Sequence, residues 1–348
     1  MVELAYAIVV LLLTGFVILD GWDIGAGLIH FAVGRNEAER GLVIRAIGPL
    51  WVWHEVWLVA LGGVLFAAFP AVLASAFAGF YLALFLLLWS LILRGVALEV
   101  RGLVRDPLWR EAWDFAFAVA SLLLALLIGA ALGNVLRGVP LGASGDFTLA
   151  FFTNFRVQGT VGILDWYTLS IAGFFVTLLG AHGASYLAVK TTGPVHDRSE
   201  RLARWLWFAV LALLVVTCAE TAVVRPELFA GIGRRPLAWL PAGVFGAGTA
   251  LAVIGQWRRR ERAAFLGSCL LIGGLMAAGA AGIYPVMLKS TLDPAASITA
   301  AGGATDAAGL RVALLWWPLA FGLAVSYALI VYRHYRGKVP ATDSGPGY

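Results

Sequence analysis

Residues 4–32 read LAYAIVVLLLTGFVILDGWDIGAGLIHFA, an apolar run with two aspartates and one histidine in its second half. A hydrocarbon core about 30 Å thick is crossed by roughly 20 helical residues, so this run is long enough to span a bilayer. Of the 348 residues in the chain, 61% are hydrophobic and 13% are charged. Soluble domains have roughly 45–50% apolar and about 25% charged residues, so the excess predicts a surface that faces lipid.

Further apolar runs of comparable length follow the first. The candidate spans lie at about 4–32, 48–69, 71–97, 113–136, 163–189, 204–224, 238–256, 263–287 and 313–333. We predict an all-α integral membrane protein with about nine transmembrane helices. It forms a single polytopic membrane domain over residues 1–338, followed by a flexible C-terminal tail over 339–348. The short connections contain no phosphate-binding glycine loop, so an ATP-driven role is not expected.

Basic residues are distributed unevenly between the two sides of the predicted helices. Loops on one side carry 18 of the 25 Lys and Arg residues, Arg94 among them, and loops on the other side carry 7. Because basic loops stay in the cytoplasm, the N-terminus is predicted outside and the C-terminus inside. The net charge of +5 is spread over short clusters between apolar runs, so no nucleic-acid partner is expected.

The chain shows no pattern typical of a metal site or a cleaved signal. Its two cysteines, Cys218 and Cys269, lie inside apolar runs without CxxC or Cys/His spacing. Neither a metal site nor a disulfide framework is therefore predicted. The first apolar run is too long for a signal-peptide core and lacks a basic start, so we expect it to be retained.

Two acidic residues lie inside the first predicted span. Asp20 and Asp23 are three residues apart and therefore share one helix face. Two carboxylates one turn apart in a poor dielectric repel, which favours a proton on one of them. They are candidates for a proton path. The alternative is that they hydrogen-bond to neighbouring helices and never change charge.

The second span begins with GPLWVWHEVWL over residues 48–58. His54 and Glu55 are sequence neighbours that point about 100° apart, so they do not automatically face each other. The pair has three readings: a structural cluster among tryptophans, a proton relay, or haem ligation by His54.

Other ionisable residues receive less functional weight. His182 lies among small residues, which favours a hydrogen-bonded imidazole at a close helix contact, with haem ligation as the alternative. His30 lies near the inner end of the first span, where it can reach water. Asp114 is expected at a membrane interface, and Glu220 is expected to snorkel or to pair with Arg225.

Taken together, these segments resemble subunit II of the cytochrome bd-type quinol oxidases. The similarity is carried by LDGWDIGAG at 19–27, GRNE at 34–37, GPLW at 48–51, EVWL at 55–58, GGVLFAAFP at 62–70, GFY at 79–81, WREAWD at 109–114, GNVLRGVP at 133–140, GASYL at 183–187, YP at 284–285 and MLKSTL at 287–292. The similarity extends over nearly the whole chain.

The resemblance implies a fold of two four-helix bundles plus one peripheral helix. It implies a heterodimer with a haem-bearing subunit I that holds haem b and haem d, sometimes joined by a small single-helix subunit. The complex oxidises quinol and reduces O2 to water in a prokaryotic cytoplasmic membrane. This chain would then be an accessory, haem-free subunit with no catalytic residue of its own. Its expected roles are assembly, stability, part of a proton path and a bound quinone or lipid.

One position departs from the family. Many relatives have an aspartate, implicated in proton uptake, where this sequence has Val52. Valine carries no proton, so either His54 and Glu55 replace that aspartate or protons enter elsewhere. The proton-path residues predicted for this chain are Asp20, Asp23, His54 and Glu55. The alternative functions are an ion or proton transporter and a subunit that ligates haem through His54 or His182.

Overall fold

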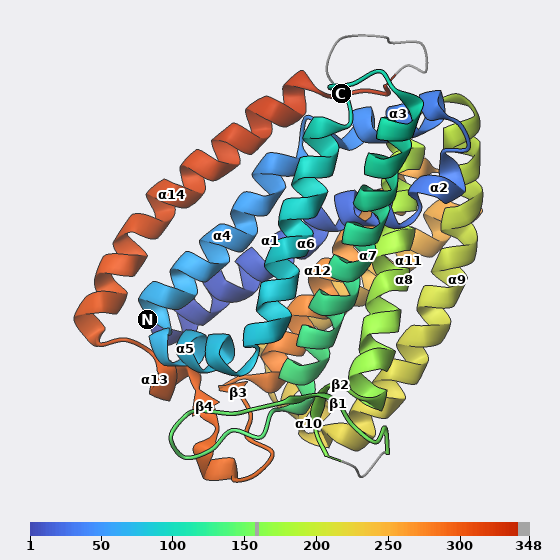
Figure 1. Cartoon of the computed structure of the whole chain (residues 1–348). Coiled ribbons are helices and arrows are strands. Elements are labelled where there is room, and N and C mark those ends of the chain that lie inside the picture. Colours follow the sequence, from blue (N-terminus) through green and yellow to red (C-terminus); the bar gives the residue numbers. More distant parts are fainter. Residues whose placement is uncertain (157–159, 340–348) are drawn as a thin grey trace.

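The structure is a computed structural model that describes residues 1–156 and 160–339 (Figure 1). Within these ranges, nine helices are long and apolar enough to cross a membrane, which confirms the predicted fold class. They are α1 (Val2–Leu28), α4 (Trp51–Ala68), α6 (Tyr81–Val100), α7 (Pro107–Arg137), α8 (Trp166–Lys190), α9 (Gly193–Val224), α11 (Trp239–Trp257, preceded by the short helix η1, Pro236–Ala238), α12 (Glu261–Ile283) and α14 (Ala307–His334).

Shorter elements lie at the two ends of these helices. The helices among them are α2 (His30–Val33), α3 (Glu37–Ile47), α5 (Pro70–Gly79), α10 (Pro226–Arg234), η2 (Pro294–Ala296) and α13 (Ala300–Gly303). Strands β1 (Ala150–Phe152) and β2 (Gly162–Leu164) pair in parallel, and β3 (Val286–Leu288) and β4 (Ile298–Thr299) pair antiparallel. Figure 1 shows the strands at one end of the helices and α3 at the other. We call these the strand end and the α3 end.

Several helix boundaries differ from those predicted. The run at 71–97 forms two helices, α5 and α6, which meet at Phe80, where the backbone leaves helical geometry (φ −96°, ψ 17°). Helix α7 begins at Pro107 rather than 113, because the Asp106 carboxylate caps it and accepts from the Leu108 and Trp109 N–H groups. The hydropathy pattern detects only the apolar stretch of such a helix, whereas polar residues can extend the helix beyond it.

The long helices form two groups of four. Helices α1, α4, α6 and α7 make the first bundle, and α8, α9, α11 and α12 make the second. The bundles meet where α1 and α7 contact α8 and where α1 contacts α12. Helix α14 lies at the periphery against α4 (Figure 1). The first residue of the predicted tail, Val339, donates to the Lys190 carbonyl at 2.7 Å, and the remainder, 340–348, lies outside the described residues.

Glycine allows α1 and α8 to approach closely. A Cβ atom on Gly25 would lie 2.0 Å from the Leu179 carbonyl oxygen, and one on Gly183 would lie 2.4 Å from the Gly25 carbonyl carbon. No side chain fits at either position, so the two backbones are in direct contact. The contact holds the glycine face of α1 against the second bundle.

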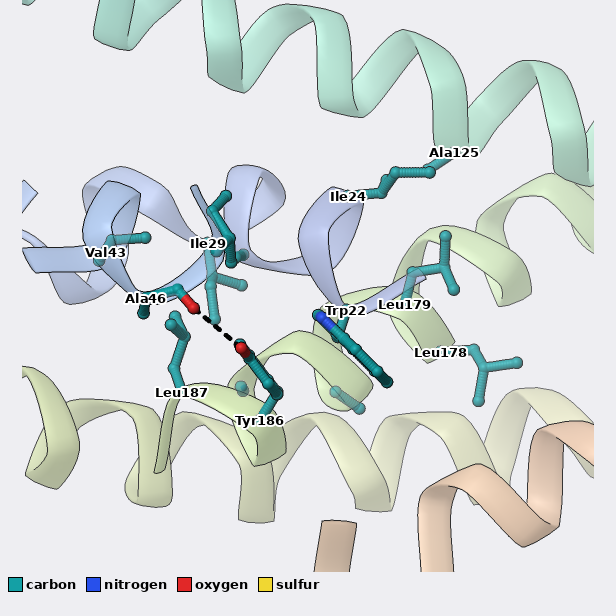
Figure 2. Close-up of a cluster of buried hydrophobic side chains, with 14 of the residues drawn as sticks. Trp22, Ile24, Ile29, Val43, Ala46, Ala125, Leu178, Leu179, Tyr186 and Leu187 are labelled. Atoms are coloured by element: carbon teal, nitrogen blue, oxygen red, sulfur yellow. Dashed lines mark hydrogen bonds between the residues drawn. The ribbon is translucent and has the colours of Figure 1, made fainter. Parts of the chain in front are cut away.

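Aromatic side chains continue this contact toward the α3 end. The rings of Trp22 and Tyr186 stack with centroids 5.1 Å apart, and the Tyr186 hydroxyl donates to the Ala46 carbonyl at 2.8 Å. Figure 2 shows both rings among buried aliphatic side chains from α1, α3 and α8. The short helix α3 is thereby tied to both bundles.

Candidate functional site

The two predicted acids of α1 are fully buried and face α4 and α6. Asp20 accepts a hydrogen bond from Arg94 of α6, with 2.6 Å between Oδ1 and Nη2. The same Nη2 atom donates to Glu55 of α4 at 2.7 Å. Arg94 therefore joins one carboxylate from α1 to another from α4 in the interior of the first bundle.

His54 completes this group from α4. Its Nδ1 atom lies 2.5 Å from Asp23 Oδ2, and both side chains are fully buried. The rings of Trp22 and Trp53 flank the imidazole, with centroids 4.9 Å and 4.4 Å away. The structure thus brings together all four predicted proton-path residues. We call Asp20, Asp23, His54, Glu55 and Arg94 the carboxylate cluster.

Arg94 was missed in the sequence, where it was assigned to an inner loop. That assignment is wrong, because Arg94 lies within α6 and is fully buried. The predicted span at 71–97 already contains position 94, which is the signal that could have placed Arg94 inside the membrane. A buried guanidinium requires paired carboxylates, and Asp20 and Glu55 supply them.

The charges of the carboxylate cluster do not balance. Three carboxylates share one guanidinium and one imidazole, so the group is neutral only when it binds additional protons. An uncompensated charge at membrane depth costs at least a few kcal/mol, which favours proton binding here. Asp20 Oδ2, Asp23 Oδ1 and His54 Nε2 are buried and have no protein partner within the described ranges. These atoms are free to accept or donate protons.

Three members of the carboxylate cluster are also residue types that ligate metal ions. Asp20, Asp23 and His54 each offer one ligand atom, and these atoms lie within 4.8 Å of one another. The Arg94 guanidinium already stands 2.6 Å from Asp20, however, and supplies the positive charge that a cation would otherwise provide. The arrangement suits protons better than a divalent ion.

Glu55 lies at the edge of the carboxylate cluster. Its side chain is 25% exposed, whereas those of Asp20, Asp23 and His54 are fully buried. Val52, one turn earlier on α4, is 56% exposed and does not take part in the cluster. Glu55 is therefore the member of the group that reaches the outer surface of the bundle.

A second ion cluster lies nearer the α3 end. Asp114 of α7, expected at an interface, is fully buried. Its two oxygens accept from Arg101 at 2.6 Å and 3.1 Å, from Arg40 at 2.8 Å and from His30 Nε2 at 2.9 Å. We call Asp114, Arg40, Arg101 and His30 the Asp114 cluster. Asp114 is thus buried among protein partners rather than solvated, and the expectation that His30 reaches water is wrong, because its side chain is fully buried beside Asp114.

His182 has a different environment from His54. Its Nε2 atom lies 2.9 Å from the Ile18 carbonyl, which can only accept, and its Nδ1 atom lies 2.7 Å from the Ser268 hydroxyl. The ring stacks on Phe265 with centroids 5.4 Å apart. Both nitrogens are engaged, so this imidazole has no free position for a metal or a proton.

Two further acids lie near the strand end. Asp165 caps α8, where it accepts from the Tyr167 and Thr168 N–H groups at 3.0 Å, and it also pairs with Arg137. Glu220 does not meet Arg225, which pairs instead with Glu227 and donates to carbonyls at the end of α7. These contacts fasten helix ends.

Comparison with known proteins places the chain in a family. Residues 1–335 match the family described as cytochrome bd terminal oxidase subunit II. A probable cytochrome oxidase subunit 2 of Haemophilus influenzae is 27% identical over 97% of this chain and 94% of its own length. Cytochrome bd ubiquinol oxidase subunit 2 of Bacillus subtilis is 28% identical over 98% of each chain. Cytochrome bd-I ubiquinol oxidase subunit 2 of Escherichia coli is 36% identical over 63% of this chain and 55% of its own length.

The fold is similar to one seen in a solved oxidase. A chain of the bd oxidase from Geobacillus thermodenitrificans superimposes with a TM-score of 0.73 over 96% of this chain and 98% of that chain, at 16% sequence identity. The family match fits a multi-spanning protein of the bacterial cytoplasmic membrane, in a complex that contains a subunit I and haems. This chain therefore belongs to the family of subunit II of the cytochrome bd terminal oxidases, as one subunit of a quinol-oxidising respiratory complex.

Proposed function

We propose that this chain is an accessory, haem-free subunit that supplies part of the path by which protons reach the site of O2 reduction in its partner. The carboxylate cluster is the observation that carries this proposal. It combines buried carboxylates, an imidazole and unpaired polar atoms inside the first bundle. Such groups are costly within a membrane and usually mark proton or ion pathways.

The arrangement suggests how protons would pass through the cluster. His54 Nδ1 and Asp23 Oδ2 are 2.5 Å apart, so one proton can be shared between them. Arg94 holds Asp20 and Glu55 at fixed positions by donating to both. A proton that arrives on Asp23 or His54 can leave through Glu55, because only Glu55 reaches the bundle surface. In this reading His54 and Glu55 replace the carboxylate that is absent at Val52.

The exposed edge of the cluster supports docking of subunit I at this position. Glu55 lies beside Val52 and Val56, whose side chains are 56% and 50% exposed. A partly exposed carboxylate at membrane depth is costly against lipid. A face of subunit I would shield Glu55 and receive its proton. A small single-helix subunit and a bound quinone or lipid remain further partners that the family resemblance implies.

The haem-free character of the chain is supported by the two candidate ligands. Both His182 nitrogens have protein partners. His54 uses Nδ1 toward Asp23, and tryptophan rings flank its imidazole. His182 therefore has no free nitrogen for haem iron. The Nε2 of His54, which has no protein partner in the described part of the chain, is fully buried with two tryptophan rings packed against the imidazole. We therefore assign haem b and haem d to subunit I.

The orientation follows from the basic residues near the α3 end. Arg40, Arg101, Arg105 and Arg198 lie there, consistent with a cytoplasmic face under the positive-inside rule. The N-terminus would then be outside and the C-terminus in the cytoplasm. Protons for O2 reduction would come from the α3 end.

Asp23→Asn in the intact complex tests this function. The amide keeps the size of the side chain but cannot bind the shared proton. Quinol-driven O2 consumption per haem should therefore fall at least about tenfold, since loss of a proton-transfer group typically costs about 100-fold or more. Haem spectra should not change. His54→Gln should likewise slow turnover with intact spectra.

Asp146→Asn, on an exposed loop, is the matched control and should behave as wild type. Normal turnover by Asp23→Asn would refute the proton path, and loss of a haem band in His54→Gln would refute the haem-free assignment. Transport activity by the isolated chain, without a haem-bearing partner in the purified material, would favour the transporter alternative instead.

A further inference from the structure

Polar groups continue along α1 from the carboxylate cluster toward the α3 end. His30 follows Asp23 by seven residues. Helix α1 ends at Leu28, the backbone leaves helical geometry at Ile29 (φ −101°, ψ 7°), and His30 begins α2. The face of α1 that carries Asp23 continues to Gly27, and the His30 ring packs against Phe117 of α7 with centroids 5.4 Å apart.

A hydroxyl group stands between these two titratable residues. Gly27 lies on this face, between Asp23 and His30 in the sequence, and a Cβ atom there would lie 2.0 Å from Ser121 Oγ of α7. Ser121 is fully buried and donates to the Phe117 carbonyl at 2.8 Å. A hydroxyl that donates one hydrogen bond keeps two lone pairs for others. The missing side chain at Gly27 is what admits this hydroxyl to the α1 backbone.

The Asp114 cluster connects His30 to the surface. Asp114 accepts from Arg40 and Arg101, whose side chains are 15% and 9% exposed. Two guanidiniums keep this carboxylate ionised, so it accepts the Nε2 proton of His30 and leaves Nδ1 as the variable atom. His30 thereby has a fixed orientation and one free nitrogen.

Polar atoms without a protein partner among the described residues lie at both ends of the stretch between His30 and Asp23. His30 Nδ1 and Asp23 Oδ1 are buried and have no protein partner within residues 1–156 and 160–339. Buried polar atoms of this kind are normally completed by ordered water. At helical spacing seven residues rise about 10 Å, a distance that the Ser121 hydroxyl and a few waters can connect by hydrogen bonds.

We propose that His30 and Ser121 conduct protons from the α3 end to Asp23, with Asp114 as a fixed anion that positions His30. The neutral His30 ring accepts at Nδ1 a proton from a hydronium ion, which reaches the buried ring through ordered water and is left as a water molecule, and the ring becomes an imidazolium. That proton passes through water to the Ser121 hydroxyl oxygen, and the hydroxyl turns its own hydrogen away from the Phe117 carbonyl and releases it through water to Asp23. The ring returns to its neutral form, and no electrons move. This route rests on the proposed function, because it delivers protons to the carboxylate cluster.

The test uses the intact complex with His30→Gln and Ser121→Ala. Glutamine retains a donor for Asp114 but cannot carry a proton, so O2 consumption per haem should fall at least about tenfold. O2 consumption per haem by Ser121→Ala should fall several-fold. Both variants should show a larger solvent isotope effect on O2 consumption than wild type. A purely structural role would lower the amount of complex without changing the isotope effect per haem.

Ser90→Ala is the matched control. Ser90 is also buried, and it donates to the Leu86 carbonyl at 2.8 Å in the same way, but it lies on the strand side of Arg94. Its turnover and isotope effect should match wild type. Wild-type values for both His30→Gln and Ser121→Ala, with slow turnover in Asp23→Asn, would overturn this route and leave the proposed function standing. Normal turnover in Asp23→Asn would instead refute the function itself.

Discussion

The two buried ion clusters of the first bundle have opposite charge balances. In the carboxylate cluster three acids share Arg94 and His54, and several polar atoms have no protein partner in the described chain. In the Asp114 cluster one acid is held by two arginines and a histidine, and both of its oxygens accept from two partners. The excess of carboxylates in the carboxylate cluster favours proton binding. The excess of cationic groups in the Asp114 cluster keeps its carboxylate ionised.

This difference separates groups that titrate from groups that hold them in place. Arg94 and Arg101 are seven residues apart, so they lie on one side of the α6 path. Arg94 is the only guanidinium of the carboxylate cluster among the described contacts, but Arg101 shares Asp114 with Arg40. Replacing Arg94 or Arg101 therefore tests directly whether the two clusters differ in charge balance.

The largest effect is expected from Arg94→Met. Methionine is also a long side chain, but it leaves the buried Asp20 and the partly exposed Glu55 without their donor. Breaking a buried ion pair by removing one partner costs about 3–5 kcal/mol. We expect a severe loss of assembled complex, measured as haem-containing complex per unit of membrane protein. Arg94→Lys should recover part of that yield.

Addition of Asp20→Asn to Arg94→Met provides a sharper version of this test. If the defect comes from uncompensated carboxylates, the double variant should assemble better than Arg94→Met alone. An equal or greater loss in the double variant would show that Arg94 acts through packing instead, and the charge comparison would fail.

Much of the fold was predictable from the sequence because a membrane span leaves a strong signal. Apolar runs of sufficient length gave nine spans, and the cost of burying charge identified Asp20 and Asp23. The contact between His54 and Asp23 could not be predicted, since it depends on how α1 packs against α4. Sequence neighbours such as His54 and Glu55 point different ways, and only tertiary structure shows that both join the cluster.

Arg94 and Asp114 were misassigned for a related physical reason. Each lies within about two turns of a helix end, where a long side chain can reach water and where acids are cheaply solvated. Position alone therefore does not separate a solvated charge from a buried one. The distinction comes from partners on other helices: Asp20 and Glu55 for Arg94, and Arg101 for Asp114.

A smaller effect is expected from Arg101→Met. Asp114 would keep Arg40 and His30 as donors, so the variant loses charge-assisted hydrogen bonds worth about 1.5–3 kcal/mol but leaves no unpaired acid. The complex should assemble at reduced thermal stability, measured as the midpoint of irreversible inactivation. A yield as low as that of Arg94→Met would contradict the difference between the clusters.

The smallest effect is expected at the surface, where Glu39 of α3 pairs with Arg198 of α9 over 2.5 Å. The hydrogen bond from Arg198 holds the pKa of Glu39 below its ordinary value of 4.5. A depressed acid pKa stabilises the fold above that ordinary value, and this contribution is lost as pH falls through the folded pKa. Because the pair borders solvent, Glu39→Gln should cost under about 1 kcal/mol at neutral pH.

The difference between wild type and Glu39→Gln should therefore shrink below pH 4.5 and in high salt, which screens surface charges but not the buried clusters. Thermal inactivation of both proteins across pH, together with Arg198→Gln and the double variant, measures the coupling between the two side chains. A coupling energy of about 3–5 kcal/mol, the cost of breaking a buried ion pair, would mean that α3 is held by a buried pair. A small, salt-sensitive coupling would confine the strong electrostatic interactions to the two clusters inside the bundle.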